Sequence, residues 1–244
     1  MATPRIKAIL RGSGRNYYLK LLSAKPANLI AYWPLWEASG SVANDFSGNA
    51  RHGAYTGVTL GEIGIGDGRT CPWFDGIAQN DRVNVYSTGL ASAVSFSEGS
   101  IMVWAKVNSA AVWTDAVNRI MFSLNSGGGE SIYMDKLDAS SIRFNYTGNG
   151  VTRNYALAGL SDIDWMCLAF TWSVANAECK CYKDGVLVQT LLAPDPWTGS
   201  LWVDGANIGQ VYVGAGNNWH GWLAHAAMWN TPLTETQVAN LAAL

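Results

Sequence analysis

The chain has 244 residues, of which 49% are hydrophobic and only 14% are charged. Such a composition supplies enough apolar side chains for a large core and excludes an intrinsically disordered chain. Six of the 16 Lys and Arg residues precede the first acidic residue, Glu37, so the chain begins with a basic segment and the remainder is acidic. We expect the basic segment to bind an acidic partner, and we do not expect that partner to be nucleic acid, because the body lacks a basic, aromatic-rich platform.

Residues 1–28 are predicted to form an N-terminal arm that anchors the rest of the chain, residues 29–244, to a partner. The basic side chains expected to pair with acidic groups of that partner are Arg5, Lys7, Arg11 and Arg15. Within the arm, the four-residue spacing of Tyr17 and Leu21 predicts a short helix over residues 16–24.

The first residues lack the long apolar run of a signal peptide. No stretch of the sequence is apolar over the length that a membrane-spanning helix needs. We therefore expect a protein that is made in a cytosol, is not secreted by the usual route and does not bind membranes.

Alternation of apolar and polar residues is the main pattern after the arm, and it is typical of strands. It predicts strands at residues 100–107, 119–124, 130–137, 141–148, 165–172, 179–190, 211–216 and 221–229. Gly, Asn, Asp and Pro separate these strands, and no helical pattern lies between them. The sequence therefore predicts one all-β domain built as an antiparallel sandwich or jelly roll.

A second short helix is predicted at the C-terminus. Thr234 and Gln237 have the spacing of a capping box, and Leu233 and Val238 have the spacing of a hydrophobic staple around it. The apolar residues that follow lie on one side of the helix, which predicts that it packs on the sandwich.

Five pieces of the sequence, in this order, resemble the concanavalin A-like, laminin G-like jelly rolls. They are AYWPLWEASGSVANDFSGNARHGAY (31–55), WFDG (73–76), VWAKV (103–107), CYKDGVLV (181–188) and GWLAHAAMWNTPLTETQVANL (221–241). The resemblance covers about residues 28–244 and implies a two-sheet antiparallel jelly-roll sandwich with short N-terminal and C-terminal helices. The leader YYLKLLSAKPANLIAYWPL also looks like the leaders of phage and bacterial proteins of this type.

The loop that follows the first strand permits two interpretations. Asp45 and Asn49 can bond neighbouring backbone groups and so stabilise a turn. The resemblance also implies a calcium site, because several members of the superfamily bind calcium, and Asp45, Asn49 and Asp75 would supply hard oxygen ligands. Family members usually carry an acidic residue where this chain has Ala224 and His225, which favours the turn. No other cofactor is indicated.

Catalysis is not expected from this sequence. Glycoside hydrolases of the superfamily place paired carboxylates on one strand face, whereas the acidic residues here are scattered singly through turns. The three histidines have no metal-ligand spacing, and no Ser nucleophile elbow is present.

Carbohydrate binding is favoured by tryptophans in two predicted loops, residues 195–205 and 216–222. Trp197 and Trp219 are the residues expected to expose their indole faces to sugar rings. The groups expected to bond sugar hydroxyls are Asn217, Asn218 and Asp204. Trp202 and Trp222 also belong to these segments, and the alternative interpretation is that they lie in strands and fill the core.

Two functions follow from the sequence. The first is a non-catalytic structural or decorating protein of a larger assembly, namely a phage virion component such as a capsid decoration, fibre or tail protein. Its partners would be other virion proteins, bound through the arm, and copies of itself. The alternative is a lectin-like module that recognises a cell-surface glycan. The basic arm favours the first function, and the loop tryptophans favour the second.

Overall fold

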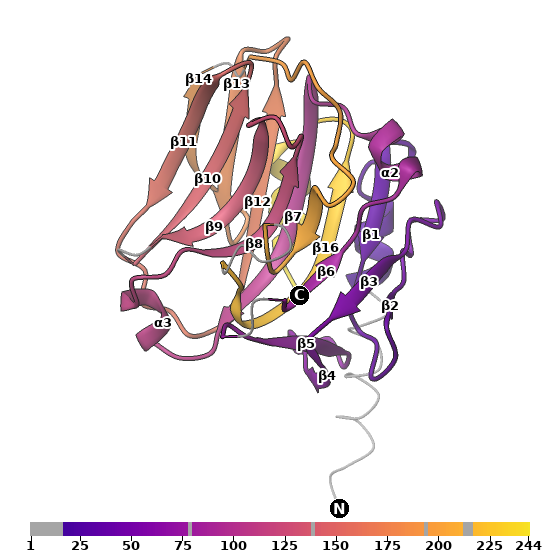
Figure 1. Cartoon of the computed structure of the whole chain (residues 1–244), viewed down its shortest axis with the longest axis vertical. Coiled ribbons are helices and arrows are strands. Elements are labelled where there is room, and N and C mark those ends of the chain that lie inside the picture. Colours follow the sequence, from indigo (N-terminus) through magenta and orange to yellow (C-terminus); the bar gives the residue numbers. More distant parts are fainter. Residues whose placement is uncertain (1–16, 78–79, 138–139, 193–194, 212–216) are drawn as a thin grey trace, which may run out of the picture.

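The computed structural model of the chain describes residues 17–77, 80–137, 140–192, 195–211 and 217–244. Within these residues, sixteen strands form two eight-stranded antiparallel sheets, which lie face to face (Figure 1). Sheet 1 contains, in spatial order, β14 (Val186–Leu192), β13 (Glu178–Lys183), β12 (Met166–Ser173), β7 (Glu98–Val107), β16 (His220–Trp229), β5 (Thr70–Asp75) and β4 (Thr59–Ile63). Its eighth strand, β1 (Leu29–Trp33), also pairs with β16.

Sheet 2 lies in front of sheet 1 in Figure 1. Its strands are β11 (Val151–Leu157), β10 (Ser141–Gly148), β9 (Ser131–Leu137), β8 (Arg119–Asn125), β15 (Ala206–Ile208), β6 (Arg82–Asn84), β3 (Gly53–Thr56) and β2 (Val42–Ala43). The short helices outside the sheets are residues 17–23, η1 (Pro26–Asn28), α2 (Thr88–Ala93), α3 (Ala111–Thr114) and α4 (Glu235–Ala242).

The predicted two-sheet antiparallel sandwich is confirmed. One large core lies between the sheets, because each strand turns alternate side chains inward. In β1, for example, Trp33 enters this core, whereas its neighbour Tyr32 packs in a second apolar cluster on the outer face of sheet 1. Sequence alternation was therefore sufficient to identify the fold class.

The predicted strands agree with the observed ones, with two differences. The segment predicted as a single strand over 179–190 is a hairpin, because Asp184 and Gly185 both have positive φ angles, 50° and 80°, and turn the chain between β13 and β14. Of the strand predicted over 211–216, residues 212–216 lie outside the described residues.

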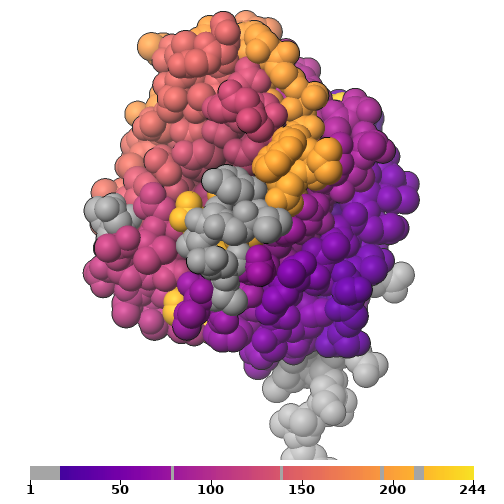
Figure 2. Space-filling model, viewed as in Figure 1, coloured from indigo at the N-terminus to yellow at the C-terminus, as the bar shows by residue number. Residues whose placement is uncertain are grey.

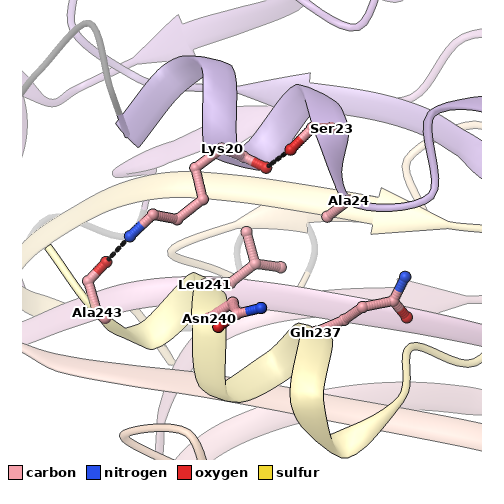
Figure 3. Close-up of a pocket in the computed structure, with 7 residues that line it drawn as sticks. All are labelled: Lys20, Ser23, Ala24, Gln237, Asn240, Leu241 and Ala243. Carbon is pink, nitrogen blue, oxygen red and sulfur yellow. Dashed lines mark hydrogen bonds between the residues drawn. The ribbon is translucent and has the colours of Figure 1, made fainter.

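Two helices cover the outer face of sheet 1. Tyr17 and Leu21 of the N-terminal helix are buried with Val238 and Leu241 of α4 in the second apolar cluster. The Tyr17 hydroxyl donates to the Leu241 carbonyl at 3.0 Å and accepts from the Trp104 indole N–H at 2.6 Å. The two helices line a small groove in which Lys20 Nζ donates to the Ala243 carbonyl at 2.6 Å (Figure 3).

The start of α4 confirms the capping box. Gln237 N donates to Thr234 Oγ1 at 3.3 Å, and Thr234 N donates to Gln237 Oε1 at 2.9 Å. Leu233 and Val238, the predicted staple, are both buried in the same cluster.

The predicted arm is not separate from the sandwich throughout its length. Residues 17–23 of the predicted arm 1–28 are packed on sheet 1, so the packed unit includes part of the arm. The anchoring residues Arg5, Lys7, Arg11 and Arg15 lie outside the described residues, and their role stays a prediction.

Candidate functional site

The Asp45 carboxylate is saturated by donors from the protein. Oδ1 accepts from the backbone N–H groups of Tyr32 and Ser47, at 2.9 and 2.8 Å. Oδ2 accepts from the Ser47 hydroxyl and from Arg51 N, both at 2.9 Å. The side-chain amide of Asn49 donates to the carbonyls of β1. Both residues therefore stabilise the loop, as the turn interpretation predicts.

The predicted calcium ligands do not come together. Asp45 is bonded to Tyr32, which pairs with Ala227 of β16, whereas Asp75 pairs with His220 at the other end of that strand. Seven positions along a strand correspond to roughly 20 Å. A single site made from Asp45, Asn49 and Asp75 is therefore a wrong prediction. In the described part of the chain, no group of three or more His, Cys, Asp or Glu side chains could hold a metal ion.

His225 is buried in β16, where the resemblance implied an acidic residue. Its imidazole is 2% exposed and lies between the Tyr32 hydroxyl, at 2.6 Å from Nδ1, and the Asp67 carboxylate, at 3.1 Å from Nε2. Burial raises the pKa of Asp67, but the interactions of its carboxylate with His225 and Arg69 together outweigh burial and hold the pKa below its ordinary value. This buried chain of hydrogen bonds joins β1, β16 and the loop before β5.

Trp197 and Trp219 do not expose their indole faces, contrary to prediction. Trp197 is 8% exposed and stacks on Phe96, with ring centroids 4.0 Å apart. Trp219 is fully buried, and its indole N–H donates to the carbonyls of Lys106 and Trp222. Both rings lie in the core between the sheets.

The polar residues predicted to bind sugar hydroxyls, Asn217, Asn218 and Asp204, form hydrogen bonds with other groups of the protein. Asn218 is buried, and its side-chain oxygen accepts from Gln210 at 3.0 Å. The Asn217 carbonyl accepts from Ile120 N at 2.9 Å. Asp204 is the member nearest to an open surface, because it follows Trp202 and Val203, which are 45% and 67% exposed.

Trp202 is exposed, which contradicts the alternative interpretation that it lies in a strand and fills the core. Its backbone N–H donates to the Asn125 carbonyl at 2.9 Å, and its own carbonyl accepts from Gly205 N at 2.8 Å, so the turn is fixed to β8. The indole lies against Gly127, where an added Cβ would come within 3.1 Å of it. A cavity of about 610 Å³ opens beside the ring, a volume in the range of small-molecule sites. It is lined by Asn125, Ser126, Gly127, Gly129, Glu130, Ser131 and Trp202.

The outward surface of β8 to β11 continues from this cavity, and we call it the polar face. Ile132, Met134, Phe144 and Tyr146 point into the inter-sheet core, so the residues that alternate with them point outward. The polar face consists of Ser123, Asn125, Ser131, Tyr133, Asp135, Arg143, Asn145, Thr147, Thr152 and Asn154. Figure 2 views the molecule from this side, with β8 to β11 in magenta to salmon and residues 195–205 in orange.

Strand register arranges these side chains in rows that cross the sheet. Asn125 of β8 lies opposite Ser131 of β9, which lies opposite Thr147 of β10, which lies opposite Thr152 of β11. This first row begins at the cavity, because Asn125 and Ser131 line it. A second row, next to the first, contains Ser123, Tyr133, Asn145 and Asn154.

Asn145, in the second row, orients two hydroxyl groups of the first row. It is 2% exposed, and its amide nitrogen lies 3.3 Å from Ser131 Oγ and 3.2 Å from Thr147 Oγ1. Thr147 Oγ1 lies 3.0 Å from Thr152 Oγ1. The hydroxyls of Ser131, Thr147 and Thr152 are thus linked, partly through Asn145, and like sugar hydroxyls they can both donate and accept hydrogen bonds.

The charged side chains of the polar face form one ion pair. Arg143 donates to both carboxylate oxygens of Asp135, at 3.0 and 2.7 Å, and its guanidinium lies 5.0 Å from the centre of the Tyr133 ring. Burial raises the pKa of Asp135 to about 6 although Arg143 lowers it, so the pair is ionised at neutral pH.

Glu130, at the edge of the cavity, is also engaged by protein groups. Its carboxylate accepts from the backbone N–H groups of Thr198, Gly199 and Asn149, at 2.8, 3.1 and 3.3 Å. Burial raises its pKa, but these bonds outweigh burial and hold the pKa of Glu130 below its ordinary value. Glu130 therefore fastens the loop before Trp202 to the end of β9.

The alternation of polar and apolar residues that predicts these strands also marks the outward residues of the polar face. Tyr133, Asn145 and Asn154 alternate out of phase with the core residues of three consecutive strands. Their alignment depends on strand register, which is a property of the folded sheet.

Every helix in the described part of the chain is too short or too polar to cross a bilayer.

Comparison with solved structures shows the same fold in proteins of low sequence identity. The binding domain of Paraclostridial Mosquitocidal Protein 1 superposes with a TM-score of 0.66 at 14% identity, over 89% of this chain and 52% of that one. The ligand binding domain of Botulinum neurotoxin serotype D, in complex with N-acetylneuraminic acid, gives 0.65 at 13% identity, over 91% and 52%. Domain 4 of AbnA, a GH43 extracellular arabinanase from Geobacillus stearothermophilus, in complex with arabinotriose, gives 0.61 at 16% identity, over 88% and 98%.

The chain thus spans about half the length of the two toxin binding domains and nearly all of the arabinanase domain. A comparison with curated protein sequences finds no significant match. The laminin G-type model described as the concanavalin A-like lectin/glucanases superfamily matches residues 78–239, about two thirds of the sequence. The chain therefore belongs to the concanavalin A-like lectin/glucanases superfamily.

Proposed function

We propose that this protein is a non-catalytic, carbohydrate-binding module whose ligand lies on the polar face and against Trp202. The observation that carries the proposal is the position of Trp202, an exposed indole beside a cavity, at the start of a row of amide and hydroxyl groups. An indole face stacks on the C–H surface of a sugar ring, while hydroxyl and amide groups exchange hydrogen bonds with its hydroxyls.

Two of the similar structures support this proposal by the ligands they contain. One is a neurotoxin domain in complex with N-acetylneuraminic acid, and the other is an arabinanase domain in complex with arabinotriose. The polar face also lacks the arrangement a glycosidase uses, because Asp135 is bonded to Arg143 and has no second carboxylate opposite it in the row.

The proposal is tested by replacing the exposed indole. Trp202→Ala should weaken binding to a glycan selected on an array by about 30-fold, because a central aromatic contact is worth about 2 kcal/mol. Trp202→Phe should retain most of the affinity. Trp222→Ala is the matched control, since Trp222 packs with the cluster on the outer face of sheet 1. A folded Trp202→Ala protein that binds like the wild type would contradict the proposal.

A second function, as a component of a larger assembly such as a phage particle, is compatible with the first. The observation in its favour is the place where the basic arm joins the domain. The N-terminal helix lies on the outer face of sheet 1, whereas the polar face is the outer face of sheet 2. We infer that the arm binds a partner on the side of sheet 1, opposite the polar face.

A further inference from the structure

The first row of the polar face has the dimensions of an extended binding site. It crosses four neighbouring strands, from Asn125 on β8 to Thr152 on β11. Strands in a sheet are about 4.8 Å apart, so the row is about 14 Å long. The strand spacing is close to the length of one sugar unit in a linear chain. Trp202 stands beside one end of the row, and the exposed side chain of Thr152 is at the other.

The charged groups around this row are already bonded within the protein. Among the described residues of β8 to β11, the outward charged side chains are Asp135 and Arg143, which bond each other through two hydrogen bonds. Glu130 is held by three backbone N–H groups. Further along the sheet, Asp204 accepts from Asn84 at 2.7 Å and lies 3.6 Å from the Arg82 guanidinium. A ligand carboxylate on the row would therefore meet no cation that lacks a counter-charge.

The groups offered to a ligand are uncharged. Amides or hydroxyls are carried by Asn125, Ser131, Thr147, Thr152 and Asn154. The side-chain amide of Asn145 donates to two of the hydroxyls. These groups match the donors and acceptors of a sugar that has hydroxyls and no acidic substituent. Specificity against an acidic sugar follows from the carboxylates of Asp135 and Glu130, whose bonding partners are already engaged.

We propose that the polar face selects a neutral, unbranched saccharide chain, which crosses β8 to β11 along the first row with one end stacked on Trp202. This inference rests on the proposed function and adds the class of the ligand and its direction on the sheet.

Calorimetric titration with neutral and acidic oligosaccharides, at about 50 and about 500 mM NaCl, tests the charge of the ligand. We expect binding to a neutral chain with an affinity that is the same at both salt concentrations. Binding confined to acidic chains, and weakened by salt, would overturn the inference while leaving the proposed function intact. Absence of binding to every saccharide by folded protein would instead overturn the proposed function.

Asp135→Asn tests the reason for the selectivity. The Asn side chain keeps an acceptor for Arg143 but removes the counter-charge, so binding to acidic oligosaccharides should appear and should weaken with salt. If the variant is folded and gains no acidic ligand, the charge argument is wrong.

Thr152→Val tests whether the saccharide follows the first row as far as β11, because Thr152 is the last member of that row and is exposed. Loss of its hydroxyl should weaken binding about fivefold, the effect of one hydrogen bond. Thr190→Val is the matched control, since Thr190 is an exposed threonine on β14 of sheet 1. Equal affinities for the two variants would show that the ligand does not reach β11.

Discussion

Asp45 illustrates at the scale of one residue how a carboxylate that looks like a calcium ligand can be fully occupied by its own protein. It is 7% exposed and accepts four hydrogen bonds, three of them from backbone N–H groups. Asp45→Ala would leave these donors buried without an acceptor. We expect a loss of about 3 kcal/mol in the free energy of unfolding, measured in urea.

The same residue yields a prediction about metal. Because protein donors already engage both carboxylate oxygens, the wild-type melting temperature should be the same in EDTA and in calcium. A ligand that binds only the folded state raises the melting temperature, so an increase of several degrees in calcium would contradict the turn interpretation.

Asp81 provides a test of pH dependence. It is 1% exposed, and burial, together with the nearby Asp75 carboxyl, raises its pKa to about 6. The folded protein therefore keeps this proton up to about pH 6, whereas an unfolded Asp loses it near pH 3.9. The contribution of Asp81 to stability must fall as the pH rises from about 4 to about 6.

Asp81→Asn removes this titration and should stabilise the protein by about 1–2 kcal/mol at pH 7, with little effect at pH 4. Urea unfolding at both pH values measures the difference. Asp162→Asn is the control, since its carboxylate is largely exposed. An equal effect of Asp81→Asn at pH 4 and pH 7 would show that Asp81 is ionised throughout this range.

The tryptophans show why single residues of the site were harder to predict than the fold. Trp197 and Trp219, which the sequence led us to expect on the surface, are buried. Trp202, for which burial in the core was the alternative interpretation, is exposed. Loop residues have no periodic pattern that marks their inward side. Their exposure is decided by contacts such as the stacking of Trp197 on Phe96, which is about a hundred positions away in the sequence.

At the scale of elements, the Tyr17 hydroxyl links the N-terminal helix to both sheet 1 and α4. Tyr17→Phe would leave the Trp104 indole N–H and the Leu241 carbonyl without their partner. We expect a loss of about 2 kcal/mol in the free energy of unfolding. Tyr18→Phe is the matched control, because Tyr18 lies in the same helix and contributes mainly ring packing. A loss that is the same for both variants would assign the effect to the helix in general.

Element length accounts for much of what could be predicted, although the seven-residue edge strand β11 was not among the predicted strands. The long strands β7, β10, β12 and β16 carry enough alternating positions to be recognised. Strands of two to five residues, such as β2 and β6, have too few positions for a pattern and are fixed by their neighbours in the sheet. The α4 helix was predicted because its capping box is a local signal.

At the scale of the whole molecule, the predicted role of the N-terminal arm as an anchor can be tested by deletion. Deletion of residues 1–15 should leave the sandwich folded, because the described core begins at Tyr17. If the arm anchors the protein, the truncated protein should no longer enter its assembly. Circular dichroism and thermal melting check the fold, and sedimentation with the partner particle checks incorporation. Normal incorporation of the folded, truncated protein would refute the anchoring role.

The opposite placement of the N-terminal helix and the polar face has a consequence for binding strength. If a partner held several copies side by side on the side of sheet 1, each polar face would point away from that partner, and all copies could reach one target surface together. Each further contact then forms at a high effective concentration, and overall avidity can exceed the affinity of one site by about 10²–10⁴. A shallow sheet surface that binds a single sugar chain weakly would suffice for firm attachment by the array.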